Sequence, residues 1–131
     1  MHRNTFLVSP RLLDRYYRVR GNERIMFAGQ ITGVEGYVES TASGCLAAME
    51  LARRLEGKGP VNFPRETAMG AMALYVSDSS VVNFQPMNVT FGIMAPLEKR
   101  IRNKQQRCAA IAERALTILA EKREILSHPL V

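Results

Sequence analysis

The stretch that decides the fold reads FAGQITGVEGYVESTASG and occupies residues 27–44. A short apolar run at residues 25–28 leads into it and predicts a buried strand. Residues 29–36 then hold three glycines in eight positions, which predicts a tight turn. Apolar residues recur at helical spacing over residues 37–55 and predict one helix, whose first turns are rich in small side chains. The sequence therefore predicts a strand, a turn and a helix in direct succession.

In α/β proteins such a succession presents the start of a helix to a ligand. The first N–H groups of a helix have no partner within it and carry partial positive charge, so they favour anionic or electron-rich atoms. Glycines let the backbone approach a ligand closely. The pattern is not the G-x-G-x-x-G of dinucleotide sites, so two interpretations stay open: a ligand-binding turn, and a structural turn in an ordinary α/β layer.

The rest of the chain predicts further short elements and one long helix. Residues 5–8 are β-like and stop at a Ser-Pro pair, while Gly and Pro at residues 57–60 end the preceding helix. Residues 65–76 predict a second helix, and residues 81–84 predict a short strand. From about Pro96 a long helix is predicted to run towards Ser127, with an apolar stripe along one side.

The composition is that of an ordinary soluble domain. The chain has 131 residues, of which 47% are hydrophobic and 23% are charged. No apolar run approaches the ~18 residues of a membrane span, and the first residues lead into no secretory signal. We therefore expect a cytoplasmic protein with no membrane partner. Cys45 and Cys108 lie on apolar helical faces without metal-ligand spacing, so we expect free, buried thiols and no metal site.

The net charge of +6 is unevenly spread. Residues 1–24 carry six arginines against two carboxylates, and residues 96–131 carry eight basic groups against four glutamates. Residues 25–95 are slightly acidic. Basic ends suit a polyanion such as RNA, because Lys and Arg release the counterions that condense on phosphates. A basic surface that is merely solvated explains the same charge, and both interpretations stay open.

The predicted C-terminal helix carries the main candidates for contact with phosphates. Arg100, Arg107 and Arg114 lie seven residues apart and would share one helical face. The candidate nucleic-acid-binding residues are Arg100, Arg102, Lys104, Arg107 and Arg114. The alternative is that this helix packs on the remainder of a larger enzyme and faces solvent with its basic side.

Three segments resemble those of one enzyme family. Residues 27–44 resemble the second flavin-binding segment of the folate- and FAD-dependent tRNA uracil-5-methyltransferases. MHRNTF at residues 1–6 and FQPMNVTFG at residues 84–92 resemble further segments of that family. The flavoproteins that modify the tRNA wobble uridine have a related GQI-x-G-x-x-GY pattern, but those two further segments point to the methyltransferases.

The chain is thus similar to the C-terminal portion of these enzymes. The fold class that this resemblance implies is α/β. It would be the C-terminal part of a Rossmann-like FAD/NAD(P)-binding flavoprotein, with helices flanking a few short strands and a long basic C-terminal helix.

The resemblance also implies a place for FAD. Gly29 and Gln30 would contact the ribityl hydroxyls, and the residues that follow would wrap the flavin ring. The helix beginning near Gly36 would direct the positive end of its dipole at the flavin carbonyls. The alternative for Tyr37 is simple packing. The implied cofactor-binding residues are Gly29, Gln30, Gly33, Val34, Glu35, Gly36 and Tyr37.

The family transfers a one-carbon unit from methylenetetrahydrofolate to a T-loop uridine of tRNA, and NAD(P)H recharges its FAD. The resemblance implies that His2, Arg3 and Asn4 line the folate pocket, where the imidazole would stack on the pterin and the amide would read its polar edge. The alternative for His2 is a terminal residue without a role. Gln85 and Asn88 suit either a buried hydrogen-bond network or the active site. Neither cysteine is expected to act as a nucleophile.

Part of such an enzyme is missing from the sequence. No G-x-G-x-x-G is present, so we expect the N-terminal nucleotide-binding half to be absent. Residues 1–56 would complete a FAD-binding domain, and residues 57–131 would form a helical region. A lone strand is unstable, so the chain is expected to need its missing half, or to oligomerise through exposed apolar surface, and to be inactive alone. A stand-alone RNA-binding fragment and a non-functional gene remnant are the alternatives.

Overall fold

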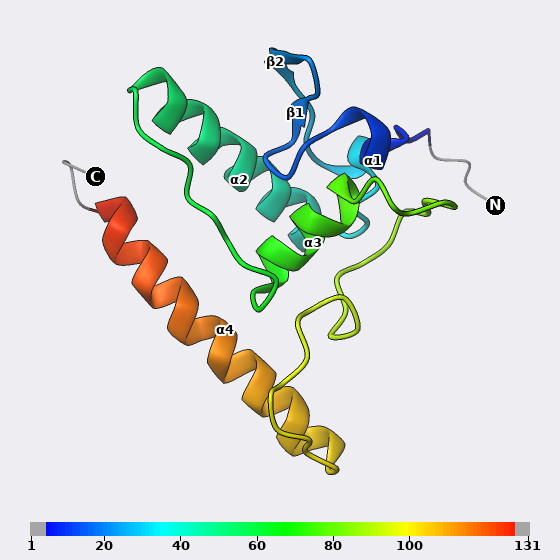
Figure 1. Cartoon of the computed structure of the whole chain (residues 1–131), viewed down its shortest axis with the longest axis vertical. Coiled ribbons are helices and arrows are strands. Elements are labelled where there is room, and N and C mark those ends of the chain that lie inside the picture. The colour runs from blue at the N-terminus through cyan, green and yellow to red at the C-terminus, as the bar shows by residue number, and fades with distance from the viewer. Residues whose placement is uncertain (1–4, 128–131) are drawn as a thin grey trace.

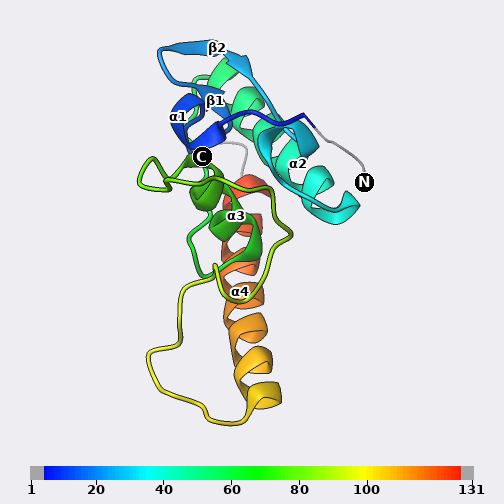
Figure 2. The ribbon, with the colours of Figure 1, turned by 90° about the vertical axis from the view of Figure 1, so that its right-hand side faces the viewer.

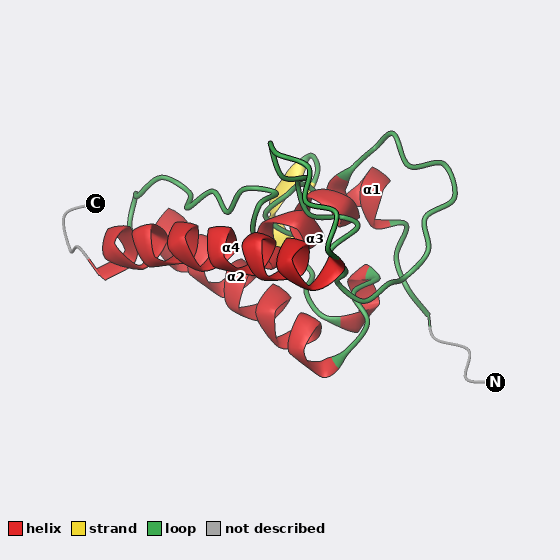
Figure 3. Cartoon of the chain, turned by 90° about the horizontal axis from the view of Figure 1, so that it is seen from below, coloured by secondary structure: helices red, strands yellow, loops and turns green. Residues whose placement is uncertain are grey.

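The computed structural model describes residues 5–127, and its regular secondary structure is mainly helical (Figure 1). Figure 3 shows how little of it is strand. Helices α2 and α3 lie near the small β-hairpin, and α4 runs past α3 as a long rod (Figures 1 and 2). In chain order the elements are α1 (Ser9–Leu12), β1 (Arg18–Val19), β2 (Asn22–Met26), the 3₁₀ turn η1 (Gln30–Thr32), α2 (Tyr37–Leu55), α3 (Ala68–Ser77) and α4 (Lys104–Ser127).

The predicted helix over residues 37–55 is confirmed, because α2 has those bounds. It begins directly after Gly36 and ends before Gly57, whose φ of 73° only glycine adopts readily. Its inner face carries small or apolar side chains against α3, together with Glu50. The carboxylate of Glu50 is buried but lies 3.6 Å from the guanidinium of Arg18, which offsets the loss of its hydration.

The main core lies where α1, α2 and α3 meet the loops between them. Leu13, Tyr17, Val34 and Val76 are all fully or almost fully buried there. Phe84 joins the same core from the segment after α3 and contacts the ring of Tyr75 at a centroid distance of 5.5 Å. The core therefore gathers residues from distant parts of the chain around the predicted turn.

Three strand predictions need correction. The predicted buried strand at residues 25–28 is wrong in place and in burial, since β2 covers Asn22–Met26 and is largely exposed. Among the described residues it pairs antiparallel with β1 alone, and of its residues only Met26 packs against the main core. Residues 5–8 and 81–84 form no strand. In the first segment, the Leu7 N–H donates one isolated hydrogen bond to the Ile31 carbonyl (2.8 Å), which is not part of a β-ladder.

The predicted fold class is confirmed only as a combination of helices and strands with a long C-terminal helix. Residues 5–127 combine helices with a two-stranded antiparallel sheet, and α4 is the long C-terminal helix that was expected. No parallel sheet of the Rossmann kind is present in that range. No helix within it is both long and apolar enough to span a membrane.

The other two helices start later than their apolar patterns predict. Helix α3 begins at Ala68 because the hydroxyl of Thr67 accepts a hydrogen bond from the Gly70 N–H (3.0 Å) and caps the helix. Helix α4 begins at Lys104, where the Asn103 side chain accepts from the Gln106 N–H (3.0 Å) in the same way. Residues 96–103 are consequently a loop, and the prediction that a helix begins at residue 96 is wrong.

The prediction that Cys45 is buried is also wrong. Cys45 is exposed on α2, and Cys108 is half-buried on α4; both thiols are free. The side of α2 that faces the core is instead set by Ser43, Leu46, Ala47 and Glu50, one turn apart. Within residues 5–127 no group of three His, Cys, Asp or Glu side chains gathers that could hold a metal ion.

Two helical glycines provide a matched test of the packing. A Cβ at Gly70 would lie 2.1 Å from the Pro64 carbonyl oxygen and 2.3 Å from that of Phe63, whereas one at Gly44 meets nothing within 4 Å. We expect Gly70→Ala to lower the free energy of unfolding by about 1–3 kcal/mol, because the backbone has to move apart. Gly44→Ala should raise it by up to ~1 kcal/mol through helix propensity. Urea unfolding followed by circular dichroism measures both free energies. Equal effects would contradict the close contact between Gly70 and the carbonyls of Phe63 and Pro64.

Candidate cofactor and nucleic-acid sites

The glycine-rich turn adopts a backbone that only glycine tolerates well. Gly29, Gly33 and Gly36 have φ values of 83°, 91° and 99°. In that region a Cβ would clash with the following carbonyl. The turn thus folds back sharply from β2, passes through η1 and enters α2, as the glycine pattern predicts.

Helix α2 and the N-terminal segment hold the inner side of the turn. The Ser43 hydroxyl accepts a hydrogen bond from the Gly29 N–H (2.8 Å) and donates to the Ser40 carbonyl (2.8 Å). The buried Ser9 hydroxyl donates to the Thr32 carbonyl (2.6 Å). Small polar residues are needed at these two positions, because each hydroxyl satisfies a backbone group that the tight turn removes from water.

The segment after α3 holds the other side of the turn. Val34 and Met87 form a parallel bridge, in which the Met87 N–H donates to the Gly33 carbonyl and the Glu35 N–H donates to the Met87 carbonyl, both at 3.0 Å. The Asn88 amide donates to the Glu35 carbonyl, also at 3.0 Å. Asn88, left open by the sequence, therefore lies in a hydrogen-bond network that supports the turn.

Glu39 links this segment to the start of α2. Its carboxylate accepts from the Val89 N–H at 3.2 Å and from the Asn88 amide at 3.4 Å. These contacts, after the larger effect of its own backbone N–H, hold the pKa of Glu39 below its usual value. A carboxylate in the first turn also suits the positive end of the helix dipole. The start of α2 thus already carries a negative charge.

The seven predicted cofactor residues divide between an open and a closed side. Gln30, Gly36 and Tyr37 are exposed, and Tyr37 is the most open of them at 96%. A Cβ at Gly29 would meet no atom within 4 Å, so there is open space beside this residue, although its own N–H and carbonyl are bonded to Ser43 and Thr32. Val34 is fully buried and belongs to the core.

Two of the remaining predicted cofactor residues lie against the supporting segment. A Cβ at Gly33 would lie 2.4 Å from the ring of Phe84, and the half-buried Glu35 bonds through its backbone to Met87. The residues predicted for folate, His2, Arg3 and Asn4, lie outside the described residues.

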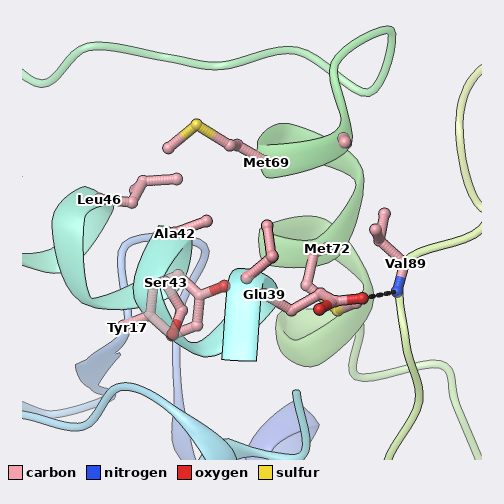
Figure 4. Close-up of a pocket in the computed structure, with 10 residues that line it drawn as sticks. Tyr17, Glu39, Ala42, Ser43, Leu46, Met69, Met72 and Val89 are labelled. Atoms are coloured by element: carbon pink, nitrogen blue, oxygen red, sulfur yellow. Dashed lines mark hydrogen bonds between the residues drawn. The ribbon is translucent and has the colours of Figure 1, made fainter. Parts of the chain in front are cut away.

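A small apolar pocket of about 140 Å³ lies between α2 and α3, next to the turn. Figure 4 shows Ala42, Ser43 and Leu46 of α2 on one side and Met69 and Met72 of α3 on the other. Tyr17 closes its base, and burial raises the pKa of that phenol above its usual range. The lining is almost wholly apolar, so the pocket suits a side chain or a small apolar group rather than an anion.

A second, larger hollow carries most of the predicted phosphate contacts. It measures about 960 Å³ and lies between the loop at residues 91–102 and the first turns of α4. Three of the five predicted residues line it, namely Arg100, Arg102 and Arg107. The sequence interpretation missed Arg65, Phe91 and Lys99, which line it too. Phe91 belongs to the FQPMNVTFG segment, but nothing in that segment indicated that its ring would lie beside arginines. We call this hollow the basic groove.

The prediction that Arg100, Arg107 and Arg114 share a helical face is wrong. Arg100 lies in the loop before α4, and Arg114 serves the structure rather than the groove. Its guanidinium donates to the carbonyls of Ala95 and Pro96, 3.0 Å away for Pro96, and so fixes the loop to α4. Lys104 is exposed at the first position of α4 without lining the groove.

Glu39→Gln tests the link between the turn and its support. A carboxyl whose pKa is lower in the folded state than in the unfolded state stabilises the fold at pH values above its unfolded-state pKa, near 4.5 for Glu39. This contribution is lost as the pH falls through the folded-state pKa. We therefore expect the wild type to exceed Glu39→Gln in melting temperature at pH 7, with the gap closing below about pH 4.5. Melting curves from pH 3 to pH 8 measure this, and parallel curves would show that the carboxylate contributes nothing.

Arg114→Ala tests the structural role assigned to that side chain. Two carbonyls would lose a charged donor, so we expect the free energy of unfolding to fall by about 1.5–3 kcal/mol. The exposed Arg102 provides the control, since Arg102→Ala should change stability by no more than about 0.5 kcal/mol. Chemical denaturation compares the two variants, and equal stabilities would show that Arg114 does not stabilise the fold.

Comparisons with known proteins agree with the resemblance seen in the sequence. Residues 1–59 match the family model described as glucose inhibited division protein A. The chain is 56% identical over 116 residues to the methylenetetrahydrofolate–tRNA-(uracil-5-)-methyltransferase TrmFO of Ligilactobacillus salivarius, a match that covers 88% of this chain and 27% of that protein. It is 51% identical over 127 residues to the enzyme of the same name from Staphylococcus carnosus, with 96% and 29% covered.

The enzyme of that name from Natranaerobius thermophilus is 52% identical over 121 residues, which cover 92% of this chain and 28% of that protein. The chain thus spans a little over a quarter of the length of these curated relatives. The predicted resemblance is confirmed: over most of its length this chain is similar to the methylenetetrahydrofolate–tRNA-(uracil-5-)-methyltransferases.

Proposed function

We propose that this chain forms part of the flavin site and part of the tRNA-binding surface of a methylenetetrahydrofolate–tRNA-(uracil-5-)-methyltransferase. The observation that carries the proposal is the two-sided turn at residues 29–37. Its inner side is tied to α2 and to the segment around Met87, while its outer side leaves open space beside Gly29 and leaves Gln30 and Tyr37 exposed. A backbone that is rigid on one side and accessible on the other is suited to holding a ligand in a fixed position.

The open residues fit the uncharged part of FAD. Gly29, whose own N–H and carbonyl bond to Ser43 and Thr32, would leave room for the ribityl chain to approach closely. Gln30 would offer its side-chain amide to the ribityl hydroxyls, and Tyr37 would pack against the flavin ring. Val34 and Gly33 would hold the turn from below. The Glu39 carboxylate offsets part of the positive charge at the start of α2, so neutral contacts rather than the helix dipole would dominate at the ring. When bound, reduced FAD supplies the reducing equivalents for the one-carbon transfer from methylenetetrahydrofolate.

The adenosine and pyrophosphate end of FAD would be held elsewhere. No G-x-G-x-x-G is present in this sequence, and the chain spans little more than a quarter of its relatives. We propose that a nucleotide-binding portion like the rest of those relatives completes the FAD site and provides access for NAD(P)H. Exposed apolar side chains on this chain, such as Val38 beside the turn and Leu55 at the end of α2, would be covered by that portion rather than by a second copy.

The basic groove would contact the tRNA. Arg100, Arg102 and Arg107 line it, and Lys104 lies exposed at the start of α4, whereas Arg114 would act only by fixing the loop. Reaction with tRNA and NAD(P)H would take place in the cytoplasm. His2, Arg3 and Asn4 remain the residues proposed for folate.

A stand-alone RNA-binding role is the second candidate. The observation that favours it is that this chain alone encloses the basic groove, whereas it offers FAD only one side of a site. Under this alternative the chain binds RNA and has no flavin.

FAD binding separates the two candidates. The chain is co-expressed with the N-terminal portion of the Ligilactobacillus salivarius relative, and bound flavin is measured by absorbance and fluorescence. We expect retention of FAD by the pair and weak or no retention by either part alone. In the pair, Tyr37→Ala should weaken FAD binding by about 5- to 10-fold through loss of an aromatic contact.

Val82→Ala is the matched control, because Val82 is exposed but lies outside the turn. It should leave FAD binding unchanged. A pair that assembles but never retains FAD would overturn the flavin assignment, and tRNA methylation by the pair is measured only once FAD is bound.

A further inference from the structure

The basic groove combines a strong positive charge with one exposed aromatic side chain. It lies where the chain leaves α3 and turns into α4, the yellow-green to yellow part of Figures 1 and 2. Its basic residues come from three separate places: the start of the α3 region, the loop and the first turn of α4. They are Arg65, Lys99, Arg100, Arg102 and Arg107.

These five side chains are available to an anion. All five are exposed, and none forms a salt bridge with a carboxylate of residues 5–127. Hydrogen bonds from Ser80 lower the pKa of Asp78, and Arg65 lies close enough to that carboxyl to contribute to the shift. Glu98 is the one acidic residue among those that line the groove. A concave surface with one sign of charge concentrates the electrostatic potential, so it attracts a polyanion more strongly than the same charges spread on a flat surface.

The groove is held in shape before any ligand arrives. The Nε of Arg65 donates to the Ile93 carbonyl (3.0 Å), and the Arg65 carbonyl accepts from the Ala95 N–H (3.0 Å). Arg107 donates from one terminal nitrogen to the Ile101 carbonyl (3.1 Å). Beneath the loop, Met94 packs with Ile111 of α4. Two of the arginines that line the groove are therefore restrained by hydrogen bonds to backbone carbonyls, which lowers the conformational entropy that their side chains lose on binding.

Phe91 distinguishes this groove from a simple charged surface. Its side chain is 48% exposed although it lines the groove, while neighbouring Met94 is buried. An exposed aromatic ring beside several guanidinium groups is the combination that binds unpaired nucleotides, because a base stacks on the ring while the cations contact the phosphates. In a duplex each base already stacks on its neighbours and does not reach such a ring.

We propose that the basic groove binds a single-stranded segment of RNA, with one base stacked on Phe91 and the flanking phosphates on Arg65, Lys99, Arg100, Arg102 and Arg107. The volume of about 960 Å³ lies near the top of the usual range for ligand pockets, ~300–1,000 Å³, and leaves room for backbone on either side of the base. The inference deepens the proposed tRNA contact, on which the identity of the RNA rests. The preference for an unpaired segment rests on the groove alone.

Fluorescence anisotropy of the 131-residue chain tests this with a short, unstructured, end-labelled RNA and with the same strand in a duplex. We expect tighter binding of the single strand. Phe91→Ala should weaken it by about 5- to 100-fold, while Phe91→Tyr, which keeps a stacking ring, should bind like the wild type. Phe91→Leu keeps apolar bulk without a ring and should behave like Phe91→Ala.

A variant and a matched control test how charge contributes to RNA binding. Arg102→Ala should reduce the slope of log affinity against log salt by about one unit, since one phosphate contact is lost. Arg123→Ala, an exposed arginine near the far end of α4, should leave the slope unchanged.

Equal affinity for duplex and single strand, or equal binding by Phe91→Leu and Phe91→Tyr, would overturn the stacking proposal and leave a non-specific polyanion surface. No binding of either RNA would overturn the groove assignment altogether. These outcomes are separate from the flavin test, because that test measures FAD binding at the turn of residues 29–37 and not RNA binding in the groove.

Discussion

The parallel bridge between Val34 and Met87 holds the rest of this structure in place. Two hydrogen bonds of 3.0 Å tie the Gly33–Glu35 backbone to a segment more than fifty residues away in sequence. Without them the glycines would leave the turn free to adopt many conformations, because glycine has the largest backbone freedom of any residue. The bridge also brings Phe84 beneath Gly33 and Asn88 beside Glu39. Fixing this one contact therefore orders the turn, the start of α2 and the core between α2 and α3.

The residues that support the turn differ from those that a ligand would contact. Side chains that satisfy or cover the turn, such as Ser9, Ser43 and Val34, are buried, whereas Gln30 and Tyr37 on the outer side are exposed. The basic groove follows the same plan, since Arg114 fixes the loop from behind and Arg100 and Arg102 remain accessible. In both places the rigidity comes from hydrogen bonds to backbone carbonyls or N–H groups. A ligand would then meet groups already in position, which reduces the entropy that binding has to overcome.

The two proposed sites are connected through the core by helix α3. Helix α3 contacts α2 on one side and, through Ala71, the α4 residues Ile111 and Ala115 on the other. The turn is anchored to α2, and the groove is built on α4, so α3 connects them as a shared packing element. The tight approach of Gly70 to the carbonyls of residues 63 and 64 sets how closely α3 lies against the segment before it.

The sequence by itself determined the helix at residues 37–55, the glycine turn before it and the family resemblance. It could do so because glycine positions, helical spacing and short motifs are local properties of the chain. The bounds of α3 and α4 depended on the Thr67 and Asn103 caps, which are also local but compete with an apolar pattern that extends further.

Only the tertiary structure decided which predicted residues face a ligand. Val34 and Arg114 resemble their neighbours in the sequence, yet one is buried in the core and the other is bonded to a loop about eighteen residues before it. Phe91 and Arg65 entered the basic groove only because the chain folds back on itself there. Burial and long-range hydrogen bonding depend on contacts between distant segments, and no local pattern encodes them.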